Sequence, residues 1–585
     1  MRLVFDIETD GLIRQGLSKI HCIVIQDLDT KEEYRFDPTN YRDGLQMLLQ
    51  ADELWGHNII GYDIPAIQTL FPKWSPEGLV RDTLILSRLL FTDILDRDFR
   101  TRPATLPANL FGRHSLESWG HRLGVHKSDF GKGLGGDWSV YSTDMLDYCA
   151  QDVVVSVALV ELFAPKLTDY AVPIDLEHRV AEIMSWQEAE GFPFDVRKAQ
   201  QLESELRTEL DTLAGQMRDT FHFVPGKEFT PKRGNKVQGY FEGAPMTRLS
   251  EFNPTSRFHI GWAFQQHRKW EPTEFTSGGQ PKIDESILKG IGTDESLAFA
   301  RILELQKHLG QLSEGKNAWL KNVTNEGRLH HSCVLATNTG RMAHMRPNLA
   351  QVPSAHEYRE LFHAGTDRVV VGADASGLEL RCLAHYLAPF DHGQFAEEVV
   401  NGDIHTHLAG IYGTDRKGGK GVTYCLIYGG GNSKLGITAG ASPDTAARKG
   451  ASIRKSIMSG LAGFKHLSDA VASRAESGVL RGLDGRPIRL QGKSHAALNY
   501  LLQSAGAIIC KKWLVRANEL LQEAGIDYTP LAFVHDEMQL SVHPGQADQA
   551  MDLIITAMKD VEHQLKFRCQ LDSEAQSGAT WADTH

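Results

Sequence analysis

The sequence predicts an N-terminal α/β domain followed by a larger α+β region. Short strands alternate with helical periods through residues 1–165, which is an α/β pattern. Long helical periods follow over 174–221 and 294–323, and from about residue 326 onward strands and helices alternate again. A chain of 585 residues also exceeds what one hydrophobic core normally holds, so at least two domains are expected.

The composition is that of an ordinary globular protein, with 41% apolar and 23% charged residues. No apolar run reaches the roughly 18 residues of a membrane helix, and the first residues, MRLVFDIETDG, lack the pattern of a signal peptide. The seven cysteines lie far apart without a CxxC, which disfavours a zinc site or a disulfide framework and fits a reducing cytosol. The net charge of −12 alone disfavours a polyanionic partner, although carboxylates gathered around divalent cations also make a phosphate-handling protein acidic.

Two segments are interpreted as connections between the periodic regions. Pro165 and Pro173 bracket a short stretch, APKLTDYAVP, that predicts a linker leading into a helix. Residues 222–280 are rich in glycine and proline and are locally basic. The basic residues are Lys227, Lys232, Arg233 and Lys236. This segment is either a solvated loop or an arm that touches phosphates.

Acidic residues of the N-terminal segment fall in a pattern that suits metal binding. In FDIETDG, Asp6 and Glu8 are two residues apart on a predicted strand, so both carboxylates face the same side. Like charges this close repel unless a cation neutralises them. Asp63 follows a predicted loop, and DYCAQD places Tyr148 and Asp152 four residues apart on one helical face. Four carboxylates can hold two hard cations that activate water for phosphodiester cleavage, with Tyr148 orienting that water.

A second pair of acids is predicted in the C-terminal half. The apolar run VVVGA ends in Asp374, where a buried and unpaired carboxylate would cost several kcal/mol. LAFVHDEMQLSV, residues 531–542, predicts a hairpin whose tip carries Asp536. If the two strands are neighbours, Asp374 and Asp536 can share metal ions in the geometry that phosphoryl transfer needs. The hairpin tip alone is also explained as an ordinary turn.

A basic and aromatic helix is predicted over residues 416–431, RKGGKGVTYCLIYGGG. Every fourth position carries a cation or an aromatic ring: Arg416, Lys420, Tyr424 and Tyr428. Each four-residue step drifts only about 40° around the helix, so all four project from one face. Two cations and two aromatic rings on one face suit phosphates and a stacked base.

Three glycines crowd the start of this helix: Gly418, Gly419 and Gly421. Each interior glycine costs roughly 1 kcal/mol relative to alanine. The hypothesis is that this helix end is marginal without nucleotide and becomes ordered when nucleotide binds.

The N-terminal acids, in this order and context, resemble those of the DEDD-type 3′–5′ exonucleases in the version that has a tyrosine. The resemblance covers roughly residues 1–165 and implies a ribonuclease H-like α/β exonuclease domain. It implies metal ligation by four acids, Asp6, Glu8, Asp63 and Asp152. Tyr148 would position the nucleophile.

The C-terminal motifs are similar to those of the family A (DNA polymerase I-like) DNA polymerases. Motif A of that family, D-x-S-x-x-E-L-R, is matched by Asp374, Ser376, Glu379, Leu380 and Arg381. Motif B, R-x3-K-x3-[FY]-x3-Y-G, is matched by Arg416, Lys420, Tyr424, Tyr428 and Gly429, and motif C by His535, Asp536 and Glu537. Within the family, GLELRCLAH, NGDIH and HAALN resemble the replicative polymerases of short-tailed phages of the T-seven type. The implied fold is a right-hand α+β polymerase of palm, fingers and thumb.

The same resemblance implies the metal and acid–base groups of the polymerase site. Asp374 and Asp536, helped by the Ala375 carbonyl, would hold two Mg²⁺, and the exonuclease site would hold two more, with Mn²⁺ as a substitute. Lys420 would also protonate the leaving pyrophosphate.

The resemblance to family A polymerases also implies which residues bind nucleotide and DNA. Arg416, Lys420 and His405 would grip the incoming triphosphate, and Tyr424 would stack on the base and sugar. Glu379 would exclude a ribose 2′-OH by sterics and desolvation. The implied contacts to primer–template come from Arg341, Asn499, Gln503 and His535.

The resemblance also implies domain boundaries. The exonuclease domain would span residues 1–167 and the polymerase domain residues 168–585. Within the latter, the thumb is expected at about 190–325, the palm at about 326–390 and 480–585, and the fingers at about 391–479.

The predicted function is template-directed addition of deoxynucleotides to a primer 3′ end with 3′–5′ proofreading, in phage DNA replication in the host cell cytoplasm. The expected partners are primer–template DNA and deoxynucleoside triphosphates, with a phage helicase–primase and a single-strand-binding protein as further candidates and no membrane. Thioredoxin is not expected as a partner, because the thumb segment around 222–250 is short.

Two other functions stay open from the sequence. A single-subunit RNA polymerase shares the two palm aspartates and the basic, aromatic helix, but Glu379 and an N-terminal exonuclease disfavour it. A non-catalytic DNA-binding protein with relic sites is disfavoured because every metal-binding acid is present.

Overall fold

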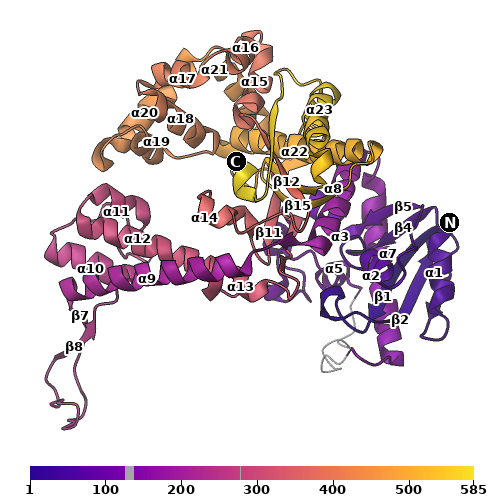
Figure 1. The fold of residues 1–585 in the computed structure, drawn as a ribbon, viewed down its shortest axis with the longest axis horizontal. Coiled ribbons are helices and arrows are strands. Elements are labelled where there is room, and N and C mark those ends of the chain that lie inside the picture. Colours follow the sequence, from indigo (N-terminus) through magenta and orange to yellow (C-terminus); the bar gives the residue numbers. More distant parts are fainter. Residues whose placement is uncertain (126–137, 277, 585) are drawn as a thin grey trace. The chain divides into compact units, whose positions relative to one another are not determined.

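The computed structural model describes residues 1–125, 138–276 and 278–584 (Figure 1). These form two compact units. Unit 1 consists of Met1–Phe192, His330–Val352 and His363–His585, and unit 2 of Pro193–Leu329 and Pro353–Phe362. Among the described residues, no helix combines the length and the apolar character that crossing a membrane requires.

A five-stranded mixed sheet forms the N-terminal part of unit 1, in the order β3–β2–β1–β4–β5. The pairs of β1 with β4 and of β4 with β5 are parallel, and the other two pairs are antiparallel. The strands are β1 (Arg2–Thr9), β2 (Ile20–Asp27), β3 (Glu33–Phe36), β4 (Glu53–Gly56) and β5 (Leu79–Asp82). The helices are α1 (Tyr41–Leu49), α2 (Asp63–Leu70), α3 (Thr83–Leu90), α4 (Ile94–Thr101), α5 (Leu116–Leu123) and α7 (Thr143–Phe163).

Alternation along β1 sends its side chains into two separate cores. Phe5 packs in the core that includes residues of α1 and α2. Val4 packs in the core built with α3, α5 and α7. Asp6 and Glu8 share the parity of Val4, so the pleat of β1 directs both carboxylates toward the face that α7 covers.

A four-stranded antiparallel sheet forms the centre of the C-terminal part of unit 1, in the order β15–β16–β12–β17. The strands are β12 (Val369–Ala375), β15 (Tyr528–Val534), β16 (Glu537–Val542) and β17 (Ser573–Gly578). The helices around it are α8 (Ala171–Glu190), α15 (Leu378–Asp391), α22 (Ala497–Glu523) and α23 (Ala547–Leu565). One large apolar core joins the sheet to these helices.

A group of helices is inserted between α15 and α22. They are α16 (Gln394–Asn401), α17 (Ile404–Tyr412), α18 (Arg416–Ile427), α19 (Asn432–Thr438), α20 (Pro443–Gly460) and α21 (Phe464–Ala475). Two small hairpins complete unit 1: β10 (Ser332–Leu335) with β11 (Met342–Met345), and β13 (Val479–Arg481) with β14 (Pro487–Arg489).

Close packing of α18 on α17 depends on a glycine. A Cβ added to Gly419 would lie 2.6 Å from the Cβ of Ala409 and 3.0 Å from the carbonyl oxygen of His405. The glycine that weakens the helix in isolation therefore permits the contact that holds it against its neighbour.

Four charged side chains, each at most 2% exposed, form an ion network inside unit 1. The carboxylate of Glu177 (α8) lies 2.7 Å from the Lys511 Nζ (α22) and 2.6 Å from the Arg486 Nη1. Arg486 also pairs with Asp484 at 2.6 Å, in the turn between β13 and β14. Arg486 closely approaches Gly340, where an added Cβ would lie 2.5 Å from Nη1. The network thus fixes α8, α22 and the backbone just before Arg341.

Unit 2 is mainly helical. Its elements are α9 (Val196–Phe221), β7 (Phe223–Phe229), β8 (Met246–Glu251), α10 (Arg257–His267), α11 (Glu285–Ile291), α12 (Asp294–Leu309), α13 (Trp319–Asn322), β9 (Arg328–Leu329) and α14 (His356–Arg359). An apolar core centred on Phe221, Phe264 and Phe299 joins α9, α10 and α12. The β7–β8 hairpin extends away from these helices (Figure 1).

Three sequence-based expectations of secondary structure were wrong in detail. Pro173 lies inside α8, which begins at Ala171. Proline is tolerated there because the backbone N–H groups of the first helical turn make no intrahelical hydrogen bond, so the N–H that proline lacks is not missed. The helix expected over 294–323 ends at Leu309 and continues as a π-helical turn to Glu314. The segment 222–280 contains the β7–β8 hairpin and α10 and is not only a loop.

Replacing Lys511 by methionine is expected to destabilise the protein by about 3–5 kcal/mol, because it removes one partner from a buried ion network. The control is Lys512→Met at the next, partly exposed position, with an expected change within about 0.5 kcal/mol. Chemical denaturation followed by circular dichroism measures both. Equal stability of the two variants would show that the network contributes nothing.

Gly419→Ala and Gly410→Ala are expected to change stability in opposite directions. The added methyl at 419 meets Ala409 and should destabilise by about 1–3 kcal/mol through overpacking. Gly410 lies within α17 with open space around its Cβ position, so alanine there should stabilise by about 0.5–1 kcal/mol. Thermal unfolding of both variants tests the pair, and a Gly419→Ala protein as stable as the parent contradicts the packing explanation.

Candidate active sites

The register of the central sheet brings Asp374 and Asp536 together. Asp374 is opposite Glu537 on β16, and Asp536 immediately precedes that residue in the β15–β16 turn. The Ala375 backbone N–H donates a hydrogen bond to the Asp536 carbonyl at 3.0 Å. His535 takes a positive φ of 57° at the first turn position, so the turn is tight enough to present Asp536 beside the end of β12.

Both aspartates have raised pKa values. Burial, followed by the charge of Asp536, raises the pKa of Asp374 to about 7. Burial, followed by the charge of Glu379, raises the pKa of Asp536 to about 6. Carboxylates held this close favour their protonated forms unless a cation is present.

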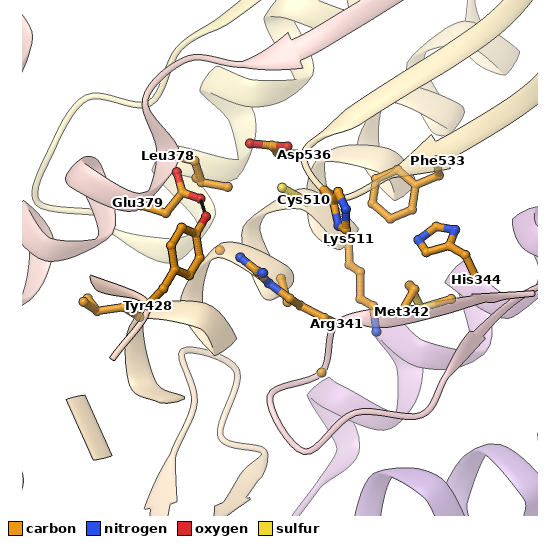
Figure 2. Close-up of a pocket in the computed structure, with 15 residues that line it drawn as sticks. Arg341, Met342, His344, Leu378, Glu379, Tyr428, Cys510, Lys511, Phe533 and Asp536 are labelled. Carbon is orange, nitrogen blue, oxygen red and sulfur yellow. Dashed lines mark hydrogen bonds between the residues drawn. The ribbon is translucent and has the colours of Figure 1, made fainter. Parts of the chain in front are cut away.

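Glu379 and Tyr428 meet beside a cavity of about 250 Å³ that Asp536 and His535 also line. The Tyr428 hydroxyl donates a short hydrogen bond to the Glu379 carboxylate. The Arg341 guanidinium carbon lies 5.7 Å from the centre of the Tyr428 ring. Figure 2 shows these side chains around the cavity, with Asp536 at its edge. Glu379 is therefore held in place by a residue of the basic, aromatic segment.

The four residues that were predicted to share one helical face lie on α18 or directly after it. Asp415 caps its N-terminus, accepting a hydrogen bond from the Gly418 N–H at 2.8 Å. The helix ends at Ile427, one residue before Tyr428, yet the Tyr424 and Tyr428 rings remain stacked at 6.4 Å. The side chains of Arg416, Lys420 and Tyr428 are exposed and that of Tyr424 is half-buried.

Two predicted nucleotide-binding residues lie next to α18. The His405 ring is 6.3 Å from the Tyr424 ring, and burial, followed by the charge of Lys420, lowers the pKa of His405. The Arg416 Nε donates to Asp403 at 2.9 Å, and this bond is the largest cause that lowers the pKa of Asp403 to about 2.

The predicted DNA-binding residues of α22 are linked to the end of α18. The Asn499 side-chain amide donates to the Ile427 carbonyl. Gln503 in turn donates to the Asn499 side-chain oxygen at 3.1 Å. His535 lies at the β15–β16 turn, with its ring 6.0 Å from the His344 ring.

The N-terminal acids also converge. Ligand atoms of Asp6, Glu8 and Cys149 lie within 4.8 Å of one another, between β1 and α7. Asp63, the first residue of α2, accepts a hydrogen bond from the Ile7 N–H at 3.3 Å. Burial raises the pKa of Asp63 to about 7, and the charges of Asp82 and Asp152 contribute in the same direction. Asp6 and Glu8 therefore lie together, and Asp63 and Asp152 lie close enough for their charges to interact.

Tyr148 is positioned on the same helix as Asp152. Its ring lies 5.8 Å from the Trp138 ring. The Trp138 carbonyl is 2.8 Å from the His21 Nε2 on β2.

Both clusters of acidic side chains, the one with Asp374 and Asp536 and the one of N-terminal acids, suit divalent cations. Each gathers oxygen donors from separate elements. Burial and neighbouring acids raise the pKa values of Asp63, Asp374 and Asp536, and a bound cation would offset both effects. Hard cations such as Mg²⁺ prefer this donor set.

Sequence reasoning missed several residues that support these sites. Cys149 donates from its thiol to the Asp6 carbonyl at 3.3 Å. Asp82 accepts hydrogen bonds from the Asn58 and Ile60 N–H groups, and so holds the loop before Asp63. An aspartate just before the helical run TLILSRLL is the only sequence signal for Asp82, as an N-cap.

The chain is similar over its full length to two phage enzymes. It is 34% identical to the DNA-directed DNA polymerase of Escherichia phage T7, with 100% of each chain covered, and equally identical to that of Enterobacteria phage T3. It is also 25% identical to DNA polymerase I of Pseudomonas aeruginosa over 57% of this chain and 39% of that one.

The fold agrees with these similarities. The structure of a Pol1 polymerase domain from M. smegmatis, in complex with DNA primer-template and dNTP, superposes with a TM-score of 0.73 at 17% identity, over 100% of this chain and 96% of that one. The family profile described as DNA polymerase family A matches residues 235–583. This chain therefore belongs to DNA polymerase family A.

Proposed function

We propose that this DNA-directed DNA polymerase extends a primer 3′ end along a template and removes mismatched ends with a separate 3′–5′ exonuclease site. The main support for the polymerase activity is that the pairing of β12 with β16 places Asp374 beside Asp536. Primer–template DNA and deoxynucleoside triphosphates are the proposed ligands, in keeping with the M. smegmatis complex.

In the polymerase site, Asp374, Asp536 and the Ala375 carbonyl would hold two Mg²⁺. Bound there, the ions would supply Lewis acidity for the primer hydroxyl and the triphosphate. The two aspartates are already fixed by the sheet, so little reorganisation is needed to receive cations.

The exposed face of α18 would receive the triphosphate. Arg416 and Lys420 offer charge-assisted hydrogen bonds to phosphate oxygens, and His405 lies close enough to α18 to join them. Lys420 would give a proton to the leaving pyrophosphate, since an ammonium group can act as a general acid. Tyr424 would stack on the incoming base and sugar.

Glu379 would act as the sugar discriminator. Its bond from Tyr428 fixes the carboxylate beside the cavity, so a ribose 2′-OH would meet an immobile and partly desolvated acid. Arg341, Asn499, Gln503 and His535 would contact primer–template near this cavity.

The N-terminal part would be the proofreading domain. Asp6, Glu8, Asp63 and Asp152 would hold two further divalent cations, and Tyr148 would orient the attacking water. The support is the approach of ligand atoms of Asp6 and Glu8 to within 4.8 Å of each other, the hydrogen bond from the Ile7 N–H to Asp63, and the charge of Asp152 that acts on Asp63.

The proposed domain division keeps the sequence-based boundaries. Residues 1–167 would form the exonuclease domain and 168–585 the polymerase domain, with the thumb at about 190–325, the fingers at about 391–479 and the palm made from the segments before and after the fingers. Compact unit 2, which begins at Pro193 and runs to Leu329 before its second segment, supports the thumb assignment.

The biological setting is also a proposal. The phage relatives support a role in phage DNA replication in the host cytoplasm, beside a helicase–primase and a single-strand-binding protein. The single hairpin between α9 and α10 supports our expectation that thioredoxin is not a partner.

Asp536→Ala and the double variant Asp6→Ala with Glu8→Ala are expected to separate the two activities. The first should abolish extension but keep trimming of a mismatched 3′ end, because it removes one polymerase ligand only. The second should trim at a rate reduced by about 10²-fold or more and still extend. Gel analysis of a labelled primer–template with Mg²⁺ measures both.

Three results would contradict the proposed function. Loss of both activities in either variant, with folding intact by circular dichroism, would falsify the two-site assignment. Extension with ribonucleotides in preference to deoxynucleotides by the parent protein would favour an RNA polymerase, and no extension at all would favour a DNA-binding protein with relic sites.

Glu379→Ala is expected to reduce discrimination against ribonucleotides by about 10–100-fold, because the side chain that excludes the 2′-OH is gone. The matched variant Tyr428→Phe keeps the carboxylate but removes the hydroxyl that fixes it, so its loss should be smaller. Single-nucleotide insertion kinetics give the ratio of kcat/KM for the two sugars. A ratio unchanged in Glu379→Ala assigns discrimination to another residue.

A further inference from the structure

The β13–β14 hairpin contributes no residue to the sites described above, yet it is firmly anchored in unit 1. Leu480 and Ile488, one on each strand, are buried in the large apolar core. The turn of the hairpin lies directly on α22, because a Cβ added to Gly482 would lie 2.9 Å from the Ile508 Cδ1 and 3.2 Å from the Ser504 Oγ. The hairpin is therefore fixed relative to α22.

The loop 337–341, which connects β10 with β11, carries Arg341 at its end. The apolar side chains that anchor these two strands lie outside the loop. Inside the loop, the Gly340 N–H donates a hydrogen bond to the Thr337 carbonyl at 3.1 Å, and the Thr337 hydroxyl donates to the Arg341 carbonyl at 2.8 Å. A short loop that is held by polar contacts depends on its neighbours for a fixed position.

Two contacts join this loop to the β13–β14 hairpin. The Asn338 side-chain amide donates a hydrogen bond to the Arg489 carbonyl, and the Asn338 side-chain oxygen accepts one from the Arg489 N–H at 3.2 Å. Gly340, with a φ of 83°, lies against Arg486, whose Nη1 would be 2.5 Å from an added Cβ. A side chain at this position would push the loop away from the hairpin. The loop is thus held at two points just before Arg341.

Arg341 lies beside the cavity that Asp536 also lines, and its guanidinium carbon is 5.7 Å from the centre of the Tyr428 ring (Figure 2). The helix α22 lines the same cavity with Leu502 and Gly506, on either side of Gln503 in the sequence. The hairpin contacts both the loop and α22. It therefore fixes the position of Arg341 relative to the helix that carries the other proposed contacts to primer–template.

We propose that the β13–β14 hairpin is a positioning element for the primer end, and that Asn338 is the positioning residue through which it acts on Arg341. Asn338 itself touches neither DNA nor nucleotide. Its hydrogen bonds hold the loop, so that the Arg341 guanidinium fits a correctly paired primer end and fits a mismatched end poorly. A group held this firmly bonds well to one geometry only, whereas a loosely held group accepts both. The proposal rests on the proposed polymerase function and on the proposed contact of Arg341 with primer–template.

Asn338→Ala should lower the preference for matched over mismatched primer ends by about 10-fold, because Arg341 keeps its side chain but loses its fixed position. Gly340→Ala should have a similar effect, since its methyl group would meet Arg486 and displace the loop. Single-nucleotide insertion by the full chain gives kcat/KM for both kinds of primer end. The primers carry a 3′-terminal phosphorothioate linkage, which resists trimming.

A double-mutant cycle separates positioning from a general loss of structure. Arg341→Ala alone should lower the same preference, and adding Asn338→Ala should lower it no further, because the group that is positioned is then gone. The matched control, Asn518→Ala, removes the acceptor of the Tyr528 hydroxyl on α22, outside the loop and the cavity lining, and should keep the parent preference.

Four results would overturn the proposal, provided that circular dichroism shows each variant to be folded. They are an unchanged preference in Asn338→Ala, an unchanged preference in Arg341→Ala, an equal loss in Asn518→Ala, and a further loss when Asn338→Ala is added to Arg341→Ala. The first and the last would show that Asn338 does not act through Arg341.

Hydrogen exchange without DNA separates this proposal from the proposed function. The amides of the loop 337–341 should exchange about 10-fold faster in Asn338→Ala than in the parent protein, and at the parent rate in Asn518→Ala. A parent protein that extends no primer contradicts the proposed function and this proposal with it. Equal exchange in the parent and Asn338→Ala, together with normal extension by the parent, contradicts this proposal alone.

Discussion

The register between β12 and β16 decides whether this chain can carry a polymerase site. It places Asp374 opposite Glu537 and beside Asp536, with the Ala375 N–H bonded to the Asp536 carbonyl at 3.0 Å. Because side chains alternate with a period of two, a slip of one residue would turn Asp374 to the other face of the sheet. The large apolar core on the sheet specifies this register, so hydrophobic patterning places the acids. Burial and the neighbouring acids raise the pKa values of both aspartates, so a cation that binds there would displace protons.

The helix α8 braces both candidate sites through two consecutive residues. Glu177 joins the buried network with Lys511 and Arg486, which fixes the backbone before Arg341. His178 accepts a hydrogen bond at 2.8 Å from the backbone N–H of Asp82, whose carboxylate holds the loop before Asp63. Burial lowers the pKa of His178, which keeps the imidazole neutral and able to accept. One helix thus contacts residues that support both candidate sites, and its pairing with Lys511 and Arg486 offsets part of the cost of burying the Glu177 carboxylate.

The sequence was informative where function depends on local periodicity. The two-residue spacing of Asp6 and Glu8, the hairpin tip at Asp536 and the four-residue spacing on α18 all predicted side-chain directions that the structure has. It was uninformative where the role of a residue depends on a contact with a residue far away in the sequence. Nothing near Lys511 indicates that its charge meets Glu177, 334 positions away, and only the tertiary fold can supply that pairing. Likewise, the hairpin segment 223–251 is stabilised by contacts of the Phe229 and Tyr240 rings with each other and with Arg248, and a composition rich in glycine and proline gives no sign of these contacts.

The helix α18 shows how an intrinsic cost in helix stability and a gain in tertiary packing combine at the proposed nucleotide-binding surface. Glycines lower its intrinsic stability, yet Gly419 is what lets it approach α17. On its exposed face, Arg416 is held by Asp403, whose lowered pKa keeps that carboxylate charged. Both groups are exposed, so water screens the pair and separating it costs little. A triphosphate offers several anionic oxygens where Asp403 offers one carboxylate, so the proposed substrate would displace Asp403 from the guanidinium without unfolding the helix. The ion pair would therefore keep Arg416 oriented before the proposed nucleotide binds and would not compete strongly with it.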